Sequence, residues 1–480
     1  MKVVVANPPW PGEGYGARTN VRWPHRRGDK KLSFPIYLAY TSAVLKREGF
    51  EVLGIDAVEK RLGISEFVKK IREFGARAII MEVSTPSIAH DLESAQALKQ
   101  QIPGIFIVLC GAHITFFNKS IIEDYGFIDA CIDGEFEYAA RDICRAISKK
   151  RGLDGIEGII YRDSKGNAVR TPRRERIQNL DELPFPDRKD FRIEDYQQAF
   201  YCGNKTALMV SSRGCPFHCT YCLWPNTLFS HQYRIRSPKS VVDEMEMLIS
   251  EEGIDEVFFD DDEFMIDKKK VRGICKEIKK RNIKINWHCN GRVDMADEKT
   301  LNMMKGAGCF QIFYGFESGS ERMLKSMKKG ITRKQMKNAV ALTKKAGIVA
   351  GGSFVFGLPG ESKDTVKQTM KFAKGLGADW VQFTLAAPFP GTPFYDEAKE
   401  KGLLEMGSWA ELDGTHGPIV KTYHLSRKDL EGIIRTAYIS YYTAPKVVWQ
   451  NLKRMRDFED MKRIGRGVKS VLSRILYYKK

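Results

Sequence analysis

The chain has 480 residues, and 43% of them are hydrophobic, which is enough apolar material for proper cores but more chain than a single domain normally uses. We therefore expect two or three domains, and no run approaches the roughly eighteen apolar residues of a membrane-spanning helix. The formal net charge of +18 fits nucleic acid, an anionic membrane surface, acidic cofactors or a lysine-rich, heat-adapted surface.

Strand and helix patterns alternate through residues 1–150. This alternation predicts a parallel sheet with helices on both faces, which is a doubly wound, Rossmann-like α/β domain. Ligands bind such sheets beyond the carboxyl ends of the strands. The predicted strands are 3–6, 52–55, 78–81, 105–110 and 128–132, and the predicted helices are 36–47, 65–74, 87–100 and 135–148.

Small and polar residues gather where four of these strands end, so they are candidate ligand-binding residues. The Gly-rich dinucleotide fingerprint is absent after the first strand, which argues against a nicotinamide or flavin dinucleotide. The strand-end residues are Asn7 and Pro8, Ser84 and Thr85, Gly111 and His113, and Gly134 and Glu135.

Residues 151–205 form a predicted linker without chemistry of its own. Residues 155–168 predict a small hairpin, and the proline-marked segment 180–186 predicts a rigid strap.

Strand and helix patterns resume from residue 206 to residue 401, now with longer helices. Six strand–helix units predict a partial TIM barrel, open at one side, with active loops at the carboxyl ends of its strands. Ser237 followed by Pro238 predicts a helix start. The predicted strands are 207–211, 256–259, 283–288, 311–315, 349–356 and 380–385.

Cys215, Cys219 and Cys222 form a C-x3-C-x2-C triad in the loop after the first barrel strand. Three thiolates can hold three irons of a [4Fe–4S] cube and leave the fourth iron open for chemistry. A zinc site is the alternative, with Cys202, Cys289 or His218 as a further ligand, although the spacing does not match the usual paired cysteines. The ten cysteines and the lack of an apolar signal segment at the start of the sequence favour a reducing cytoplasm over a disulfide scaffold.

The triad, with Tyr221 before its last cysteine, resembles the signature of the radical S-adenosylmethionine (SAM) enzymes. The resemblance implies that the open iron binds the amino and carboxylate groups of SAM. It also implies that the reduced cluster splits SAM to methionine and a 5′-deoxyadenosyl radical, which removes a hydrogen atom from an unactivated carbon.

Later loops are similar to SAM-binding segments of that family. A carboxylate suits the methionyl ammonium group, and an arginine fork suits the methionyl carboxylate. An acidic run such as 260–263 is also typical of a solvated helix start or a magnesium site. The resemblance implies SAM contacts at Tyr221, Asp261, Asp262, Arg292, Glu317, Ser318 and Ser320.

The first domain resembles the cobalamin-binding domain that precedes the radical domain in one large subfamily. That resemblance implies cobalamin at the strand-end residues given above, from Asn7 to Glu135. The chain departs from the pattern because no Asp-x-His-x-x-Gly appears after the second strand, where residues 56–63 read DAVEKRLG. We therefore expect no histidine ligand to cobalt from that loop.

Residues 402–480 predict a basic helical region. Residues 446–480 contain eleven Lys or Arg and three Asp or Glu, with apolar residues at helical spacing. Such a segment can lie in an anionic bilayer interface or pack back on the barrel, and nucleic-acid binding is the least favoured interpretation. The location we expect is the cytoplasm, with or without a peripheral contact at the inner membrane face.

The leading hypothesis is a cobalamin-dependent radical SAM enzyme that modifies an unactivated carbon by methylation, ring formation or rearrangement. The segments around Trp224 and Asn226 and around residues 258–262 resemble hopanoid-type, lipid-tailoring members, which implies a lipid or isoprenoid-derived substrate. The resemblance also implies an electron donor such as ferredoxin or flavodoxin. The alternatives are a peptide or small-metabolite methylase of the same kind, and a non-catalytic basic zinc protein that binds nucleic acid.

Overall fold

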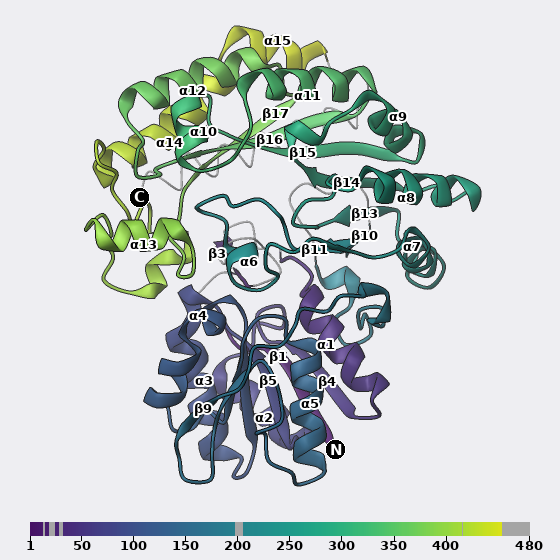
Figure 1. The fold of residues 1–480 in the computed structure, drawn as a ribbon, viewed down its shortest axis with the longest axis vertical. Coiled ribbons are helices and arrows are strands. Elements are labelled where there is room, and N and C mark those ends of the chain that lie inside the picture. Colours follow the sequence, from purple (N-terminus) through teal and green to yellow (C-terminus); the bar gives the residue numbers. More distant parts are fainter. Residues whose placement is uncertain (13–14, 19–24, 28–31, 197–204, 415, 454–480) are drawn as a thin grey trace.

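Two large sheets organise the chain. The computed structural model describes residues 1–12, 15–18, 25–27, 32–196, 205–414 and 416–453. The first sheet has the strand order β4-β1-β5-β6-β7-β8-β9, and the second has the order β10-β13-β14-β15-β16-β17. In Figure 1 the body built on the first sheet lies below the second sheet, and the short helix α6 (Leu223–Asn226) lies between them.

The first sheet begins with five parallel strands and ends with an antiparallel hairpin. Its strand β1, which lies between β4 and β5, is buried on both faces, which explains the unbroken apolar run Val3–Ala6. The strands are β1 (Lys2–Asn7), β4 (Glu51–Asp56), β5 (Ala78–Glu82), β6 (Phe106–Cys110), β7 (Ala130–Ile132), β8 (Ile159–Arg162) and β9 (Ala168–Arg170). A separate two-stranded ribbon joins β2 (Tyr15–Ala17) to β3 (His25–Arg27).

Helices cover both faces of this sheet. Val3 and Val5 share a core with α1 and α5, whereas Val4 and Ala6 share the opposite core with α2, α3 and α4. The helices are α1 (Ile36–Arg47), α2 (Ile64–Phe74), α3 (Ile88–Gln101), α4 (Ala112–Asp124) and α5 (Glu137–Ser148). The predicted doubly wound domain is confirmed, although the sequence patterns did not reveal α4.

The hairpin predicted at residues 155–168 is confirmed and extends the first sheet. Asp163 accepts hydrogen bonds from the backbone N–H groups of Lys165 and Asn167, which fixes the turn between β8 and β9. The strap that follows packs on α1, because Ser42 donates to Asp187 at 2.6 Å and Lys46 pairs with Asp187 at 2.6 Å. Much of the expected linker is therefore built into the first half of the molecule.

The second sheet consists of six parallel strands with β10 at one edge and β17 at the other, so the predicted open, partial barrel is confirmed. One strand is shifted from its predicted position. Asn282 adopts a left-handed conformation (φ 55°), and the N–H of Ile283 donates to the carbonyl of Ile278. The turn therefore includes the start of the predicted segment 283–288, and the strand begins later, at Asn286. The strands are β10 (Thr206–Met209), β13 (Glu256–Phe259), β14 (Asn286–Gly291), β15 (Cys309–Glu317), β16 (Val349–Phe356) and β17 (Trp380–Leu385).

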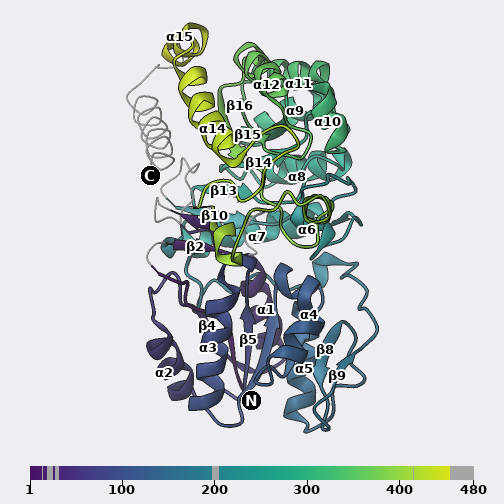
Figure 2. The ribbon, with the colours of Figure 1, turned by 90° about the vertical axis from the view of Figure 1, so that its left-hand side faces the viewer.

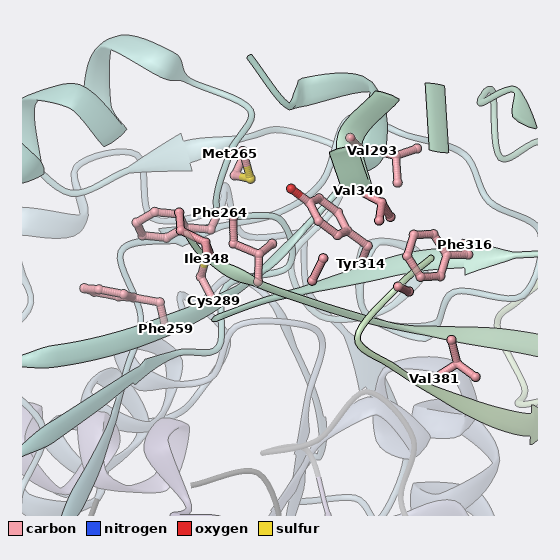
Figure 3. Close-up of a cluster of buried hydrophobic side chains, with 14 of the residues drawn as sticks. Phe259, Phe264, Met265, Cys289, Val293, Tyr314, Phe316, Val340, Ile348 and Val381 are labelled. Carbon is pink, nitrogen blue, oxygen red and sulfur yellow. The ribbon is translucent and has the colours of Figure 1, made fainter. Parts of the chain in front are cut away.

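Helices pack on the outer face of this sheet. Ser237 caps the first of them by accepting from the N–H of Ser240 at 3.1 Å, with Pro238 in the first turn, as predicted. Figure 3 shows side chains of the core, where the rings of Phe259 and Phe264 lie 4.8 Å apart. The helices are α7 (Pro238–Glu252), α8 (Lys268–Lys280), α9 (Glu298–Gly306), α10 (Glu321–Ser326), α11 (Arg333–Lys345) and α12 (Lys363–Leu376).

The chain after β17 covers the open edge of the second sheet. The hydroxyl of Tyr438 accepts from the N–H of Phe383 and donates to its carbonyl, and Tyr442 does the same at Val381. These tyrosines occupy backbone groups that an edge strand otherwise exposes. The elements are α13 (Pro393–Glu400), the 3₁₀ helix η5 (Trp409–Asp413), α14 (Arg427–Tyr442) and α15 (Pro445–Lys453).

Helix η5 reaches the first half of the molecule, where the ring of Trp409 lies 5.6 Å from that of Phe117 on α4. Figure 2 shows α14 and α15 at the top of the molecule and α4 in the body below. Within the described ranges, no helix is both long and apolar enough to cross a bilayer. Residues 454–480, which make up most of the predicted basic segment, lie outside the described residues.

Candidate active site

The cysteine loop begins where β10 ends and is closed at its base by two very short strands, β11 (Ser212–Arg213) and β12 (Arg234–Ile235), which pair antiparallel. Gly214 has a φ of 82°, and a Cβ there would lie 2.2 Å from the carbonyl oxygen of Gln232, so only glycine fits. Cys215 and Cys222 are partly exposed and Cys219 is buried, and all three are free thiols. Three thiols on one short loop suit a [4Fe–4S] cube. Cys202 lies outside the described residues, and Cys289 is buried in the barrel core.

Asp261 holds the base of this loop. It accepts from the N–H of Ser211 at 2.6 Å and from the hydroxyl of Ser212 at 2.6 Å. The ammonium group of Lys270 lies 3.3 Å away, and both charged side chains are fully buried. Asp262 accepts from the N–H of Gly214 at 2.7 Å. The geometry thus sets both aspartates against the base of the cysteine loop, and their contacts with SAM stay a prediction.

Glu263 is the acidic residue of this run that faces the cations of the barrel mouth. Burial raises its pKa to about 7, although a hydrogen bond from the N–H of Met265 and the charges of Arg292 and Lys329 favour ionisation. Only 3% of its surface is exposed. The sequence did not single out Glu263, because an acidic run does not show which carboxylate faces the barrel mouth; its place next to Phe264, a core residue, was the available signal.

Arg292 contacts the cluster loop, as its predicted position at a strand end suggested. Its guanidinium lies 3.5 Å from the ring centre of Phe217, between the first two cysteines. The same group pairs with Asp294 at 3.1 Å and donates to the carbonyl of Lys329 at 2.8 Å. A cation fixed in this way suits a carboxylate bound beside the cluster.

Glu317 and Tyr221 are brought together at the end of β15. Glu317 has a φ of 60° and pairs with Lys329 at 2.7 Å. Tyr221 donates to Glu317, and burial together with the charge of Glu317 raises the pKa of the phenol well above its usual value. Gly315 makes room, because a Cβ there would lie 2.3 Å from the Glu317 carboxylate.

Ser318 and Ser320 lie in the loop that follows. The hydroxyl of Ser318 lies 3.0 Å from that of Thr369 on α12, and it accepts from the N–H of Ser320 at 3.1 Å. Both serines are buried, and the Ser318 hydroxyl together with the N–H of Gly319 holds the loop against Thr369 of α12.

The predicted cobalamin residues lie at the carboxyl edge of the first sheet. Asn7 is 5% exposed and donates to Asp56, while its buried Oδ1 accepts no hydrogen bond from the described residues. Such an oxygen suits an amide donor, which a corrin ring carries at its periphery. Pro8 is buried beside it, so the edge fits the cofactor that the sequence implied.

Thr85 and His113 also meet at this edge. The Nδ1 of His113 lies 3.1 Å from the Thr85 hydroxyl, and its ring packs 4.7 Å from Phe117. Burial lowers the pKa of His113 to about 3, so the imidazole is neutral. Ser84 bonds to Ser87 at 2.7 Å. Gly111, with a φ of 112°, provides the turn into α4.

Glu135 behaves differently from the other strand-end residues. Its carboxylate pairs with Arg234 at 2.8 Å and with Arg213 at 3.3 Å, and it accepts from the N–H of Ile177 at 2.9 Å. The guanidinium of Arg176 fills the space where a Cβ of Gly134 would stand. Glu135 is thus paired with the arginines that flank the cysteine loop, and its contact with cobalamin stays a prediction.

An open cysteine triad at the mouth of a partial barrel, facing the ligand edge of a Rossmann-like domain, defines an iron–sulfur enzyme with a second cofactor. Residues 209–373 match the Radical SAM superfamily, and residues 30–143 match the B12 binding domain. The chain belongs to the cobalamin-binding radical SAM enzymes, and its cofactors are a [4Fe–4S] cluster, SAM and cobalamin.

Relatives of known name span most of the chain. It is 34% identical to an uncharacterized methyltransferase of Pyrococcus horikoshii, over 90% of this chain and 93% of the relative. It is 29% identical to the anaerobic magnesium-protoporphyrin IX monomethyl ester cyclase of Rubrivivax gelatinosus, over 92% of this chain and 77% of that enzyme. The fold is similar to that of the methyltransferase TsrM from Kitasatospora setae with cobalamin and a [4Fe–4S] cluster bound, with a TM-score of 0.71 at 19% identity over 99% of both chains.

Proposed function

We propose that this enzyme methylates an unactivated carbon of a lipid or isoprenoid-derived substrate. When bound, the cluster and SAM supply one-electron cleavage of SAM, and cobalamin supplies a transferable methyl group. An external donor such as ferredoxin or flavodoxin provides the electron. Cys215, Cys219 and Cys222 each hold one iron of the cluster.

The residues of the barrel mouth orient SAM in this proposal. Glu263 binds the ammonium group and Arg292 the carboxylate of its methionine part, because each is a buried or fixed charge of the opposite sign. Tyr221 and Lys329 hold the Glu317 carboxylate for the ribose hydroxyls, and Ser318 and Ser320 shape that loop. None of these groups is assigned a proton transfer.

Exposed apolar side chains near the end of the described chain support a lipid substrate. Ile439 on α14 is 42% exposed, and Val448 and Trp449 on α15 are 40% and 57% exposed. These large apolar side chains come just before a segment rich in lysine and arginine, and apolar and basic residues together favour binding to anionic bilayers. An enzyme attached to a bilayer meets substrates that reside in it.

The test compares lipids from cells with and without the gene, alongside purified enzyme prepared without oxygen and loaded with all cofactors. We expect a lipid that gains one carbon only when the gene is present, and the same product from the purified enzyme acting on vesicles of that lipid. Unchanged lipids, with a methylated peptide or small metabolite in their place, would contradict the proposed substrate.

Ring formation is a second candidate reaction. The observation that favours it is the 29% identity to a cyclase over 92% of this chain. The two reactions differ in their products: a cyclised product carries no added carbon. Growth on methionine with an isotopically labelled methyl group therefore separates them, because only methylation transfers the label to the product.

A further inference from the structure

Four buried charges join the cobalamin-binding half to the cysteine loop. Glu137 pairs with Arg213 at 2.6 Å, while Glu135 pairs with Arg213 at 3.3 Å and with Arg234 at 2.8 Å. The four side chains are 1–3% exposed. Buried ion pairs are costly to desolvate and are weak evidence for stability, so their position calls for a reason.

The two carboxylates come from the carboxyl edge of the first sheet. Glu135 follows Gly134 in the loop after β7, and Glu137 is the first residue of α5, where a negative charge also complements the helix dipole. This loop also contains Gly134, one of the residues that the sequence predicts to contact cobalamin.

The two arginines form the base of the cysteine loop. Arg213 on β11 and Arg234 on β12 are directly paired in register, and Arg213 stands two residues before Cys215. The rings of Tyr37, Tyr40 and Phe229 lie 5.2–5.6 Å from the Arg213 guanidinium, so the side chain is enclosed by aromatic faces and has one arrangement.

The barrel holds the same loop independently. Asp261 and Asp262 bind Ser211, Ser212 and Gly214, and all of these residues belong to the radical SAM domain. The link to Glu135 and Glu137 is therefore an addition to a loop that is already anchored, and it connects that loop to the other cofactor's domain.

We propose that Glu135 and Glu137 are positioning residues that fix the first cluster cysteine relative to the cobalamin site, so that the cluster senses whether cobalamin is bound. The inference rests on the proposed assignment of Cys215, Cys219 and Cys222 to the cluster. The carboxylates act through Arg213 and Arg234 and touch no cofactor.

The experiment uses the full chain, purified without oxygen and reconstituted with iron and sulfide. The EPR spectrum of the reduced cluster with SAM is recorded before and after addition of hydroxocobalamin. In the unchanged protein we expect cobalamin to alter the cluster signal. In Glu137→Gln we expect normal iron content and normal cobalamin uptake by absorption, but a cluster signal that no longer responds to cobalamin. We also expect the ratio of 5′-deoxyadenosine to product to rise by up to about 10²-fold, which is the effect of a misplacement near 1 Å.

Glu244→Gln is the matched control. Glu244 on α7 is also fully buried and pairs with two arginines, Arg188 at 3.2 Å and Arg236. Arg236 directly follows β12, but its carboxylate partner comes from the barrel, so this pair does not involve the loop after β7. We expect this variant to keep the cobalamin response. Arg213→Lys keeps the charge and loses the fork, so it replaces Glu137→Gln if that variant does not fold, and it should also lose the response.

Each outcome decides the inference. A cobalamin response that survives in Glu137→Gln or Arg213→Lys overturns it, and so does an equal loss in Glu244→Gln, because unpairing any buried arginine would then suffice. An unchanged protein that binds and reduces its cluster but shows no cobalamin response also overturns it. A protein without an iron–sulfur signal instead contradicts the assignment of the cysteines and with it the proposed function.

Discussion

Glu263 follows directly after Asp261 and Asp262, and its surroundings differ from theirs. The aspartates accept hydrogen bonds from the cysteine loop, whereas burial raises the pKa of Glu263 by more than the charges of Arg292 and Lys329 lower it. A buried carboxyl that is half protonated near neutral pH is costly to keep in a fold. Such a cost is typical of a group kept for a ligand.

Glu263→Gln tests this cost. The pKa of Glu263 rises from 4.5 to about 7, so the native state binds its proton more tightly than the unfolded state. The protonated carboxyl therefore makes its full contribution to the free energy of unfolding below pH 4.5, and this contribution is lost as the pH rises through 7. We expect ligand-free Glu263→Gln to gain on the order of 3 kcal/mol over the unchanged protein at pH 8, and nothing at pH 4.5.

Urea titrations at the two pH values measure this difference. The same variant should bind SAM more weakly, because an amide cannot pair with the methionyl ammonium group. Equal unfolding midpoints at pH 8 would show that Glu263 is compensated in the fold.

Cys219→Ala tests the cluster assignment. Loss of one thiolate should remove most of the iron and sulfide and abolish formation of 5′-deoxyadenosine. Cys289→Ala is the control, because Cys289 is buried in the barrel core and was one of the candidate further ligands in the zinc alternative. It should keep its cluster; iron loss in both variants alike would count against the triad.

Gly315→Ala tests the arrangement of Glu317. The added Cβ would lie 2.3 Å from the Glu317 carboxylate and 2.8 Å from the Lys329 ammonium group, and both can move. We expect a folded protein with normal iron content whose KM for SAM rises about tenfold, the effect of roughly 1.4 kcal/mol. Gly375→Ala in α12 meets open space and should leave KM unchanged. An unaltered KM in Gly315→Ala would remove Glu317 from the SAM site.

At the scale of elements, strands with strong apolar runs were predictable and the short or irregular elements were not. The predicted segments 256–259, 349–356 and 380–385 match β13, β16 and β17. The pair β11 and β12 has only two residues in each strand, so it carries no sequence period and exists because Asp261 and the buried arginines fix it. The candidate site residues lie near the strand ends that the sequence indicated, but the side chains they bind are decided by tertiary packing, as Asp261 and Glu135 illustrate.

Lys270→Met tests the base of the cysteine loop. Lys270 on α8 is fully buried beside Asp261, so removing it leaves an unpaired buried charge, at a cost of about 3–5 kcal/mol. We expect a lower free energy of unfolding and a loop that retains less iron. Adding Asp261→Asn to Lys270→Met should restore part of the stability. Costs that simply add in this double-mutant cycle would mean that the two groups do not interact.

At the scale of the whole molecule, the chain after β17 contacts both halves. Tyr438 and Tyr442 cover the edge of the second sheet, and Trp409 packs on α4 of the first. The helical region predicted from residue 402 onward is confirmed at α14, but the role of η5 was not predictable, because one tryptophan in a loop carries no pattern. The C-terminal region therefore stabilises the fold irrespective of any membrane contact.

Truncation after residue 453 separates these two roles. It keeps η5, α14 and α15 and removes a strongly basic segment. We expect unchanged cleavage of SAM and weaker sedimentation with vesicles of anionic lipid, with the difference shrinking as salt rises. Vesicle binding that is unchanged by the truncation or by salt would show that the basic segment makes no electrostatic contribution to it.

The buried ion pairs between the two domains limit how such proteins can exchange domains during evolution. They are formed by Glu135, Glu137, Arg213 and Arg234. Two of these residues lie in the cobalamin-binding domain and two in the radical SAM domain, and every one is buried. A recombinant that joins the cobalamin-binding half of one relative to the radical SAM half of another would bury unmatched charges unless both parents share this quartet. The two halves look like interchangeable modules, yet each constrains which partners the other can accept.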